Sequence, residues 1–216
     1  MNHFVTLAVL CFAARAFSAD GVLFRDDFAG KLDKGWSFVR ENPAAWRVTG
    51  NALQVRIEPG NMWGPQNTGK NILWREAPDV SAREVEISVT VSNRPTAQYE
   101  QVDLVWYYND SNMVKIGLEL VNGQLSIVMG REENDRTRTI NVIPNEAFQV
   151  ELRHRVKGTN IWGEYRAVGS DAWRQAGHCD LPVHGTPKLA LQCYQGPANA
   201  EHWATITNFT VRAIAP

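Results

Sequence analysis

The chain has 216 residues, of which 44% are hydrophobic and 10% aromatic, and its formal net charge is -1 at pH 7. A nearly neutral chain lacks the basic surface that electrostatic binding to nucleic acid requires, so we expect no nucleic-acid partner. The composition is also too rich in aromatic residues for a disordered protein. The length suits one domain built around one core.

The beginning of the chain predicts a signal peptide over residues 1–19. Its apolar run, residues 4–14, has the length of a signal-peptide core and is too short to span a membrane. Small residues precede Asp20 and offer cleavage positions. The alternative is a buried first strand, in which Arg15 would be poorly accommodated. We therefore expect a secreted or periplasmic protein whose mature domain covers residues 20–216, without a membrane span.

The first half of the mature chain predicts short strands followed by a meander. Short apolar segments indicate strands at residues 22–28, 46–48, 53–57 and 72–75. Apolar and polar residues then alternate at 83–91, 101–108 and 112–120, which is typical of strands with one buried face. Asn122-Gly123 is a strong two-residue hairpin signal that leads into a further strand at 124–130.

The second half continues the pattern. Residues 148–156 fit either a helix or a strand, but the turn sequence Lys157-Gly158-Thr159-Asn160 before 161–167 favours a hairpin. In that strand His154 would face the core as a structural histidine. Later strands are expected at residues 173–178, 188–194 and 204–213. Many short strands without a long helix predict an all-β fold, a two-sheet antiparallel β-sandwich of the jelly-roll type.

Two cysteines remain in the mature chain, Cys179 and Cys193, on either side of a loop rich in Pro and Gly. In an oxidising compartment an even pair predicts a disulfide. The alternative is two buried thiols that act as small apolar residues. Two cysteines without CxxC spacing supply too few ligands for zinc.

The order of several motifs resembles a known superfamily. The motifs are Phe24-Arg25-Asp26-Asp27-Phe28, Arg40-Glu41-Asn42-Pro43 with Trp46, and residues 105–115 (VWYYNDSNMVK). This order is similar to the concanavalin A-like lectin/glucanase superfamily. Within it, the chain most resembles secreted domains related to the C-terminal β-sandwich of bacterial β-xylosidases. The resemblance implies association with carbohydrate, often as a non-catalytic accessory to a glycoside hydrolase.

The resemblance also suggests a metal site. Terminal strands often pair in this superfamily, which would bring Asp26 and Asn208 together. Their oxygen atoms are suitable calcium ligands. The alternative is that both are ordinary turn and strand-end residues. No other cofactor is expected.

Signals for catalysis are weak. The Glu-x-Asp-x-x-Glu strand motif of laminarinase-like relatives is absent, as are the strand motifs of alginate lyases and the Gly-x-Ser-x-Gly elbow. Glu119 and Glu164 could form the two carboxylates that a hydrolase needs, although solvated strand faces explain both residues. A small glycoside hydrolase or polysaccharide lyase therefore stays as the alternative function.

Carbohydrate binding requires less, namely a flat aromatic ring and groups that bond to hydroxyls. The loop Asn61–Asn67 carries Trp63 among amides, Gly and Pro. Alternation sends Val102, Leu104 and Trp106 into the core, so the polar residues between them should face an open surface. The alternatives are packing of Trp63 on a sheet edge and an ordinary wet sheet face. We predict a non-catalytic domain that binds a polysaccharide or glycan through Trp63, Tyr99, Gln101, Asp103, Lys115 and Glu119.

Overall fold

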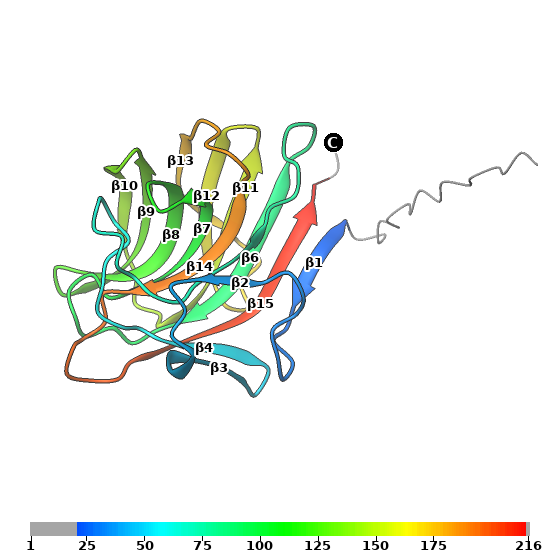
Figure 1. Cartoon of the computed structure of the whole chain (residues 1–216). Coiled ribbons are helices and arrows are strands. Elements are labelled where there is room, and N and C mark those ends of the chain that lie inside the picture. Colours follow the sequence, from blue (N-terminus) through cyan, green and yellow to red (C-terminus); the bar gives the residue numbers. More distant parts are fainter. Residues whose placement is uncertain (1–20, 215–216) are drawn as a thin grey trace, which may run out of the picture.

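The computed structural model describes residues 21–214, so the predicted signal peptide lies outside the described residues. Two antiparallel sheets pack face to face (Figure 1). The eight-stranded sheet has the order β13 (Arg174–Asp180), β12 (Asn160–Ala167), β11 (Gln149–Lys157), β6 (Val85–Ser92), β15 (Trp203–Ala213), β4 (Ala52–Arg56) and β3 (Trp46–Thr49), and β1 (Val22–Asp26) pairs with β15. The seven-stranded sheet has the order β10 (Arg136–Pro144), β9 (Gln124–Glu133), β8 (Asn112–Val121), β7 (Gln101–Asn109), β14 (Lys188–Tyr194), β5 (Ile72–Glu76) and β2 (Ser37–Val39). The predicted two-sheet sandwich is confirmed.

Helical structure is minor. A short 3-10 turn, η1 (Pro43–Ala45), precedes β3, and the side chain of Asn42 caps it by accepting from Ala44 N. Within residues 21–214 no helix is long and apolar enough to cross a membrane.

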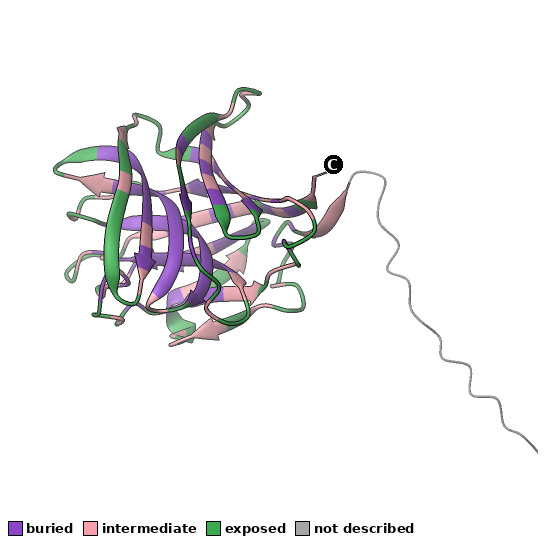
Figure 2. Ribbon diagram, turned by 90° about the horizontal axis from the view of Figure 1, so that it is seen from above, coloured by how far each residue is buried: buried purple, intermediate pink, exposed green. Residues whose placement is uncertain are grey.

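The main core lies between the sheets. Val102, Leu104 and Trp106 on β7 are each at most 1% exposed and belong to this core, as the alternation predicted. Figure 2 shows that buried residues concentrate in the central strands, whereas one strand at the edge of the seven-stranded sheet is largely exposed. Burial of the apolar face on both sheets supplies the main driving force for this arrangement.

Two predicted turns have the expected geometry. Asn122 and Gly123 join β8 to β9 with φ of 50° and 77°, the left-handed pair that a tight hairpin requires. Gly158, at φ 58°, lies in the turn between β11 and β12. Residues 149–157 are thus a strand of a hairpin, and the helical alternative is excluded.

Two strands were not predicted, β2 and β10. Strand β10 pairs only with β9, at the edge of the sheet, and most of its residues are exposed. An edge strand that buries little carries no regular alternation of apolar and polar residues, so its sequence gives no strand signal.

The predicted disulfide is wrong, because Cys179 and Cys193 are both free and buried. Cys179 lies on β13, which packs on β9 and β10, whereas Cys193 lies on β14. Three strand spacings separate β9 from β14, or about 14 Å, while a disulfide needs Cα atoms within about 7 Å. The alternative of two apolar thiols is therefore the correct one, and burial raises the pKa of Cys179 to about 12.

His154 is the buried structural histidine that the sequence predicted, at 1% exposure. Its Nε2 lies 3.1 Å from the carbonyl oxygen of Leu104 on the opposite sheet, and its Nδ1 lies 3.3 Å from that of Trp162. Burial lowers the pKa of His154 to about 4, so the ring is neutral at physiological pH. The residue joins the two sheets and is almost completely shielded from solvent.

Candidate functional site

The outer face of the seven-stranded sheet is covered, and the expectation of an open polar face is wrong. Gln101, Asp103, Lys115 and Glu119 do point away from the main core, but they are between 0% and 6% exposed. The cover is the connection between β4 and β5, residues 57–71. It contributes to a second apolar cluster on this face, formed by Met62, Ile72, Val105, Tyr107, Met113, Ala190 and Tyr194.

Polar anchors fix this connection to the sheet. Gly64 N donates to Glu132 Oε2 on β9 at 3.0 Å. Arg40 Nε donates to the carbonyl oxygen of Gly69 at 2.6 Å, and its Nη2 donates to Asp110 Oδ1 in the β7–β8 turn at 3.2 Å. The connection is thus held in its middle and near its C-terminal end, and it forms a wall over the sheet.

A cavity of about 460 Å³ remains between this wall and the sheet. Its walls are mixed, with a half-buried Trp, an exposed Tyr, three amides, an ion pair and three valines. The lining residues are Asn61, Trp63, Tyr99, Gln101, Lys115, Glu119, Val121, Val128, Thr139, Val142 and Gln195. The structure thus brings five of the six predicted site residues to one cavity, and the sixth, Asp103, lies behind its lining.

Trp63 is positioned by hydrogen bonds with the Asn61 side chain and by its contact with Gly130. The Asn61 side chain accepts from Trp63 N at 3.0 Å and donates to Trp63 O at 2.9 Å, which fixes the backbone of the loop. The far edge of the indole lies against Gly130 of β9, where an added Cβ would come within 2.5 Å of Trp63 Cη2. A glycine at position 130 is therefore what allows the ring to lie down on the sheet.

Lys115 is the electrostatic centre of the cavity. Its ammonium donates to Glu119 Oε2 at 3.0 Å, to Gln101 Oε1, and to the hydroxyl of Tyr194 at 3.4 Å. It also lies 5.0 Å from the centroid of the Trp63 ring, within the range of a cation–π interaction. Burial alone would lower the pKa of Lys115, but the charges of Asp103 and Glu119 raise it above its usual value, so the side chain is a cation.

Asp103 is a buried carboxyl group with few partners. It is 0% exposed, and among the described residues only the hydroxyl of Tyr194 interacts with it as a hydrogen-bond donor. The carboxyl occupies the space above Gly117, where an added Cβ would overlap Asp103 Oδ1. Burial raises the pKa of Asp103 to about 7, against the opposing effect of the Lys115 charge.

The rim of the cavity is formed by residues from three loops and a strand. Tyr99, 44% exposed, has φ 66°, and Gln101 Nε2 donates to its carbonyl oxygen at 2.7 Å. Gln195 Nε2 donates to Asn61 Oδ1 at 3.1 Å, which links the two loops on that side. Sequence reasoning did not single out Gln195, Tyr194 or Thr139. Tyr194 and Gln195 sit at the end of a strand that was predicted, but Thr139 belongs to β10, which was not.

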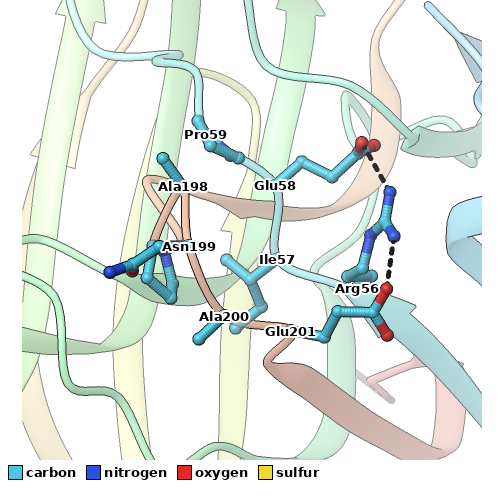
Figure 3. Close-up of a pocket in the computed structure, with 9 residues that line it drawn as sticks. Arg56, Ile57, Glu58, Pro59, Ala198, Asn199, Ala200 and Glu201 are labelled. Carbon is cyan, nitrogen blue, oxygen red and sulfur yellow. Dashed lines mark hydrogen bonds and ion pairs between the residues drawn. The ribbon is translucent and has the colours of Figure 1, made fainter.

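A second cavity of similar volume lies beside residues 197–201 (Figure 3). Its charged groups already pair with one another, since Arg56 Nη1 donates to Glu201 at 2.8 Å and Arg56 Nη2 donates to Glu58 at 3.0 Å. No aromatic residue lines it. We therefore take the Trp63 cavity as the candidate site.

The two glutamates considered as a catalytic pair do not meet. Glu119 is on β8 of the seven-stranded sheet and faces the Trp63 cavity. Glu164 is on β12 of the other sheet, where it accepts from Arg153 at 2.7 Å. The two side chains lie on opposite outer faces of the sandwich, so this pairing is excluded.

The suggested calcium ligands have structural partners. Strands β1 and β15 pair as the resemblance implied, with Asp26 opposite Phe209. The Asp26 carboxylate accepts from Phe28 N at 2.7 Å, from Asp33 N at 3.0 Å and from Trp36 Nε1 at 2.9 Å. Asn208 is exposed, and its amide lies 3.4 Å from the hydroxyl of Thr90. Within residues 21–214 no group of three or more His, Cys, Asp or Glu side chains could hold a metal ion, and the calcium site stays a prediction.

Solved structures support the same fold. A glycoside hydrolase family 43 protein from Bacillus licheniformis superposes with a TM-score of 0.78 and 20% sequence identity, over 88% of this chain and 39% of that one. A family 43 protein of a Bacteroides ovatus xyloglucan locus superposes with a TM-score of 0.74 and 17% sequence identity, over 96% of this chain and 41% of that one. A Saccharomyces cerevisiae protein of unknown function superposes with a TM-score of 0.65 and 13% sequence identity, over 84% of this chain and 98% of that one.

The chain spans about two fifths of the length of the two family 43 proteins. No curated protein matches it. The family of β-xylosidase C-terminal concanavalin A-like domains matches residues 25–196. The chain therefore belongs to the family of β-xylosidase C-terminal concanavalin A-like domains.

Proposed function

We propose that this protein is an exported carbohydrate-binding domain that binds a polysaccharide or glycan in the Trp63 cavity. The observation that carries the proposal is the indole of Trp63, held against Gly130 and partly open to a cavity rich in amides and charged groups. Aromatic rings stack on the apolar faces of sugars, and fixed polar groups orient the hydroxyls.

Two further features support the proposal. The cavity is large enough for a small number of sugar units, because its volume of about 460 Å³ is in the range of small-molecule sites. Its walls are also fixed before a ligand arrives, since Asn61, Lys115 and Gln101 are held by hydrogen bonds within the protein. A preorganised site loses less entropy on binding.

The experiment is a glycan-array screen of the protein, followed by calorimetric titration of the glycans that bind. Trp63→Ala should weaken binding by about 10- to 100-fold, which corresponds to roughly 1–3 kcal/mol for loss of a buried apolar side chain. Trp162→Ala is the matched control, because Trp162 is also half-buried but lies on the other sheet, stacked on His178 at 4.8 Å. The Trp162→Ala variant should bind glycan with the same affinity as the wild type.

Two results would contradict the proposal. One is a Trp63→Ala variant that unfolds while its remaining folded fraction binds glycan as the wild type does, which would make Trp63 a packing residue. The other is release of reducing ends from a polysaccharide panel, which would assign hydrolysis instead of binding alone. Export is tested separately by N-terminal sequencing of the protein recovered outside the cytoplasm, where a chain that still begins at Met1 would argue against a cleaved leader.

A further inference from the structure

The positive charge that faces the Trp63 cavity is already neutralised. An ammonium group has three N–H donors, and those of Lys115 go to Glu119, Gln101 and Tyr194. The ion pair with Glu119 is buried, with the two side chains 4% and 8% exposed. Lys115 therefore has no donor left for an anionic ligand.

The amide donors of the cavity are also partly committed to the protein. Gln101 donates to Tyr99 O, Gln195 donates to Asn61 Oδ1, and Asn61 in turn donates to Trp63 O. Each NH2 group keeps one further N–H for a ligand. These remaining donors carry no charge.

The spare polar atoms are mainly acceptors. Glu119 uses one oxygen for Lys115, and the described residues supply no donor for the other. Behind the lining, Asp103 has only the Tyr194 hydroxyl as a donor among the described residues, and Oε1 of its cross-strand neighbour Gln192 has none. The carboxyl groups of Asp103, Glu119 and Glu132 all interact with the single ammonium group of Lys115, so the region carries excess negative charge once Asp103 ionises.

We propose, on the premise that the cavity binds a glycan, that it selects neutral glycans and rejects glycans that carry uronate carboxylates. Neutral sugars present hydroxyl groups, which donate to spare acceptors and accept from uncharged amides. A uronate carboxylate only accepts, would meet no free cation, and would enter next to Glu119 and Asp103. Because such a charge loses its hydration without gaining a counter-charge, its binding is penalised.

The test is an array with matched neutral and acidic members, read at pH 8. It holds mannan beside mannuronan oligosaccharides, and methyl-esterified beside de-esterified polygalacturonate, within a broad set of neutral polysaccharides. We expect binding to neutral members only, with at least tenfold weaker affinity for each acidic counterpart. Acidic members that bind as tightly as neutral ones would overturn the selectivity while leaving glycan binding in place. An array without any bound glycan would instead refute the proposed function, and the selectivity with it.

A variant tests whether the carboxyl groups cause the selectivity. Asp103→Asn removes the excess negative charge without changing the side-chain shape, so the preference for the neutral member of a pair should narrow several-fold at pH 8. Asp171→Asn, in the exposed β12–β13 connection of the other sheet, changes the net charge equally and should keep the wild-type preference. A preference that stays the same in both variants would overturn the assignment of selectivity to this cluster.

Discussion

Asp103→Asn should stabilise the protein, and the gain should appear only as the pH rises. In the folded protein burial raises the pKa of Asp103 from 3.8 to about 7. Between these values the folded state holds a proton that the unfolded state has released. The stability of the wild-type protein therefore falls as pH increases through this range, and the Asn side chain, which cannot ionise, removes that loss.

The magnitude follows from the size of the shift. The difference between 3.8 and about 7 is about 3 pKa units, and each unit corresponds to about 1.4 kcal/mol. Above pH 7 the variant should thus exceed the wild type by up to about 4 kcal/mol, whereas near pH 4 the two should be nearly equal. The attraction of Lys115 and the repulsion of Glu119 are already included in the shifted pKa.

The assay is urea unfolding followed by tryptophan fluorescence, repeated from pH 4 to pH 8. Glu132, whose pKa burial also raises to about 7, titrates over the same range, so the informative quantity is the difference between variant and wild type. Asp171→Asn, at an exposed position in the β12–β13 connection of the other sheet, serves as the control for the substitution itself. A variant as stable as the wild type at pH 8, or a constant difference at every pH, would refute the view that burial raises the pKa of Asp103.

Two other outcomes follow from the packing. Gly130→Ala should displace Trp63, because the added Cβ would lie 2.5 Å from the indole edge. The affinity for glycan should fall about tenfold, while the melting temperature should change little. An unchanged affinity would contradict the placement of the ring. Cys179 and Cys193 should resist thiol reagents in the native protein and should each take up one label after denaturation without reductant, as peptide mass spectrometry would show. A pair that stays blocked until reductant is added would mean that a disulfide forms after all.

The sandwich could be predicted from sequence because its strands carry a local signal. The alternation on β7 and the Asn122-Gly123 turn depend only on neighbouring residues, and both have the expected geometry. The same alternation separated Trp106 in the core from Asp103 on the outer face. Local pattern was therefore sufficient to place Gln101, Lys115 and Glu119 on the face of the cavity, but it did not select Thr139 or Gln195.

What the sequence could not predict depends on contacts between distant segments. Burial of the polar face requires that residues 57–71 fold back over β7 and β8, and no local pattern encodes that placement. The disulfide failed for a related reason, since the residues between Cys179 and Cys193 connect strands of different sheets instead of neighbours in one sheet. The composition of the loop does not reveal which strands it connects, because Pro- and Gly-rich loops join neighbouring strands of one sheet as well as strands of different sheets.

The cluster around Lys115 is costly to bury. The main core already joins the two sheets, and the cluster lies outside it. A buried ion pair of the Lys115–Glu119 kind often contributes less stability than apolar residues of similar size would. The Asp103 carboxyl adds a further cost, because burial disfavours its ionised form. Sites that lower stability in this way are typical of functional surfaces, where a ligand supplies the missing partners. A glycan in the Trp63 cavity would bring hydroxyl groups to Glu119, the member of this cluster that lines the cavity, and for that reason we place the function at this face of the sandwich.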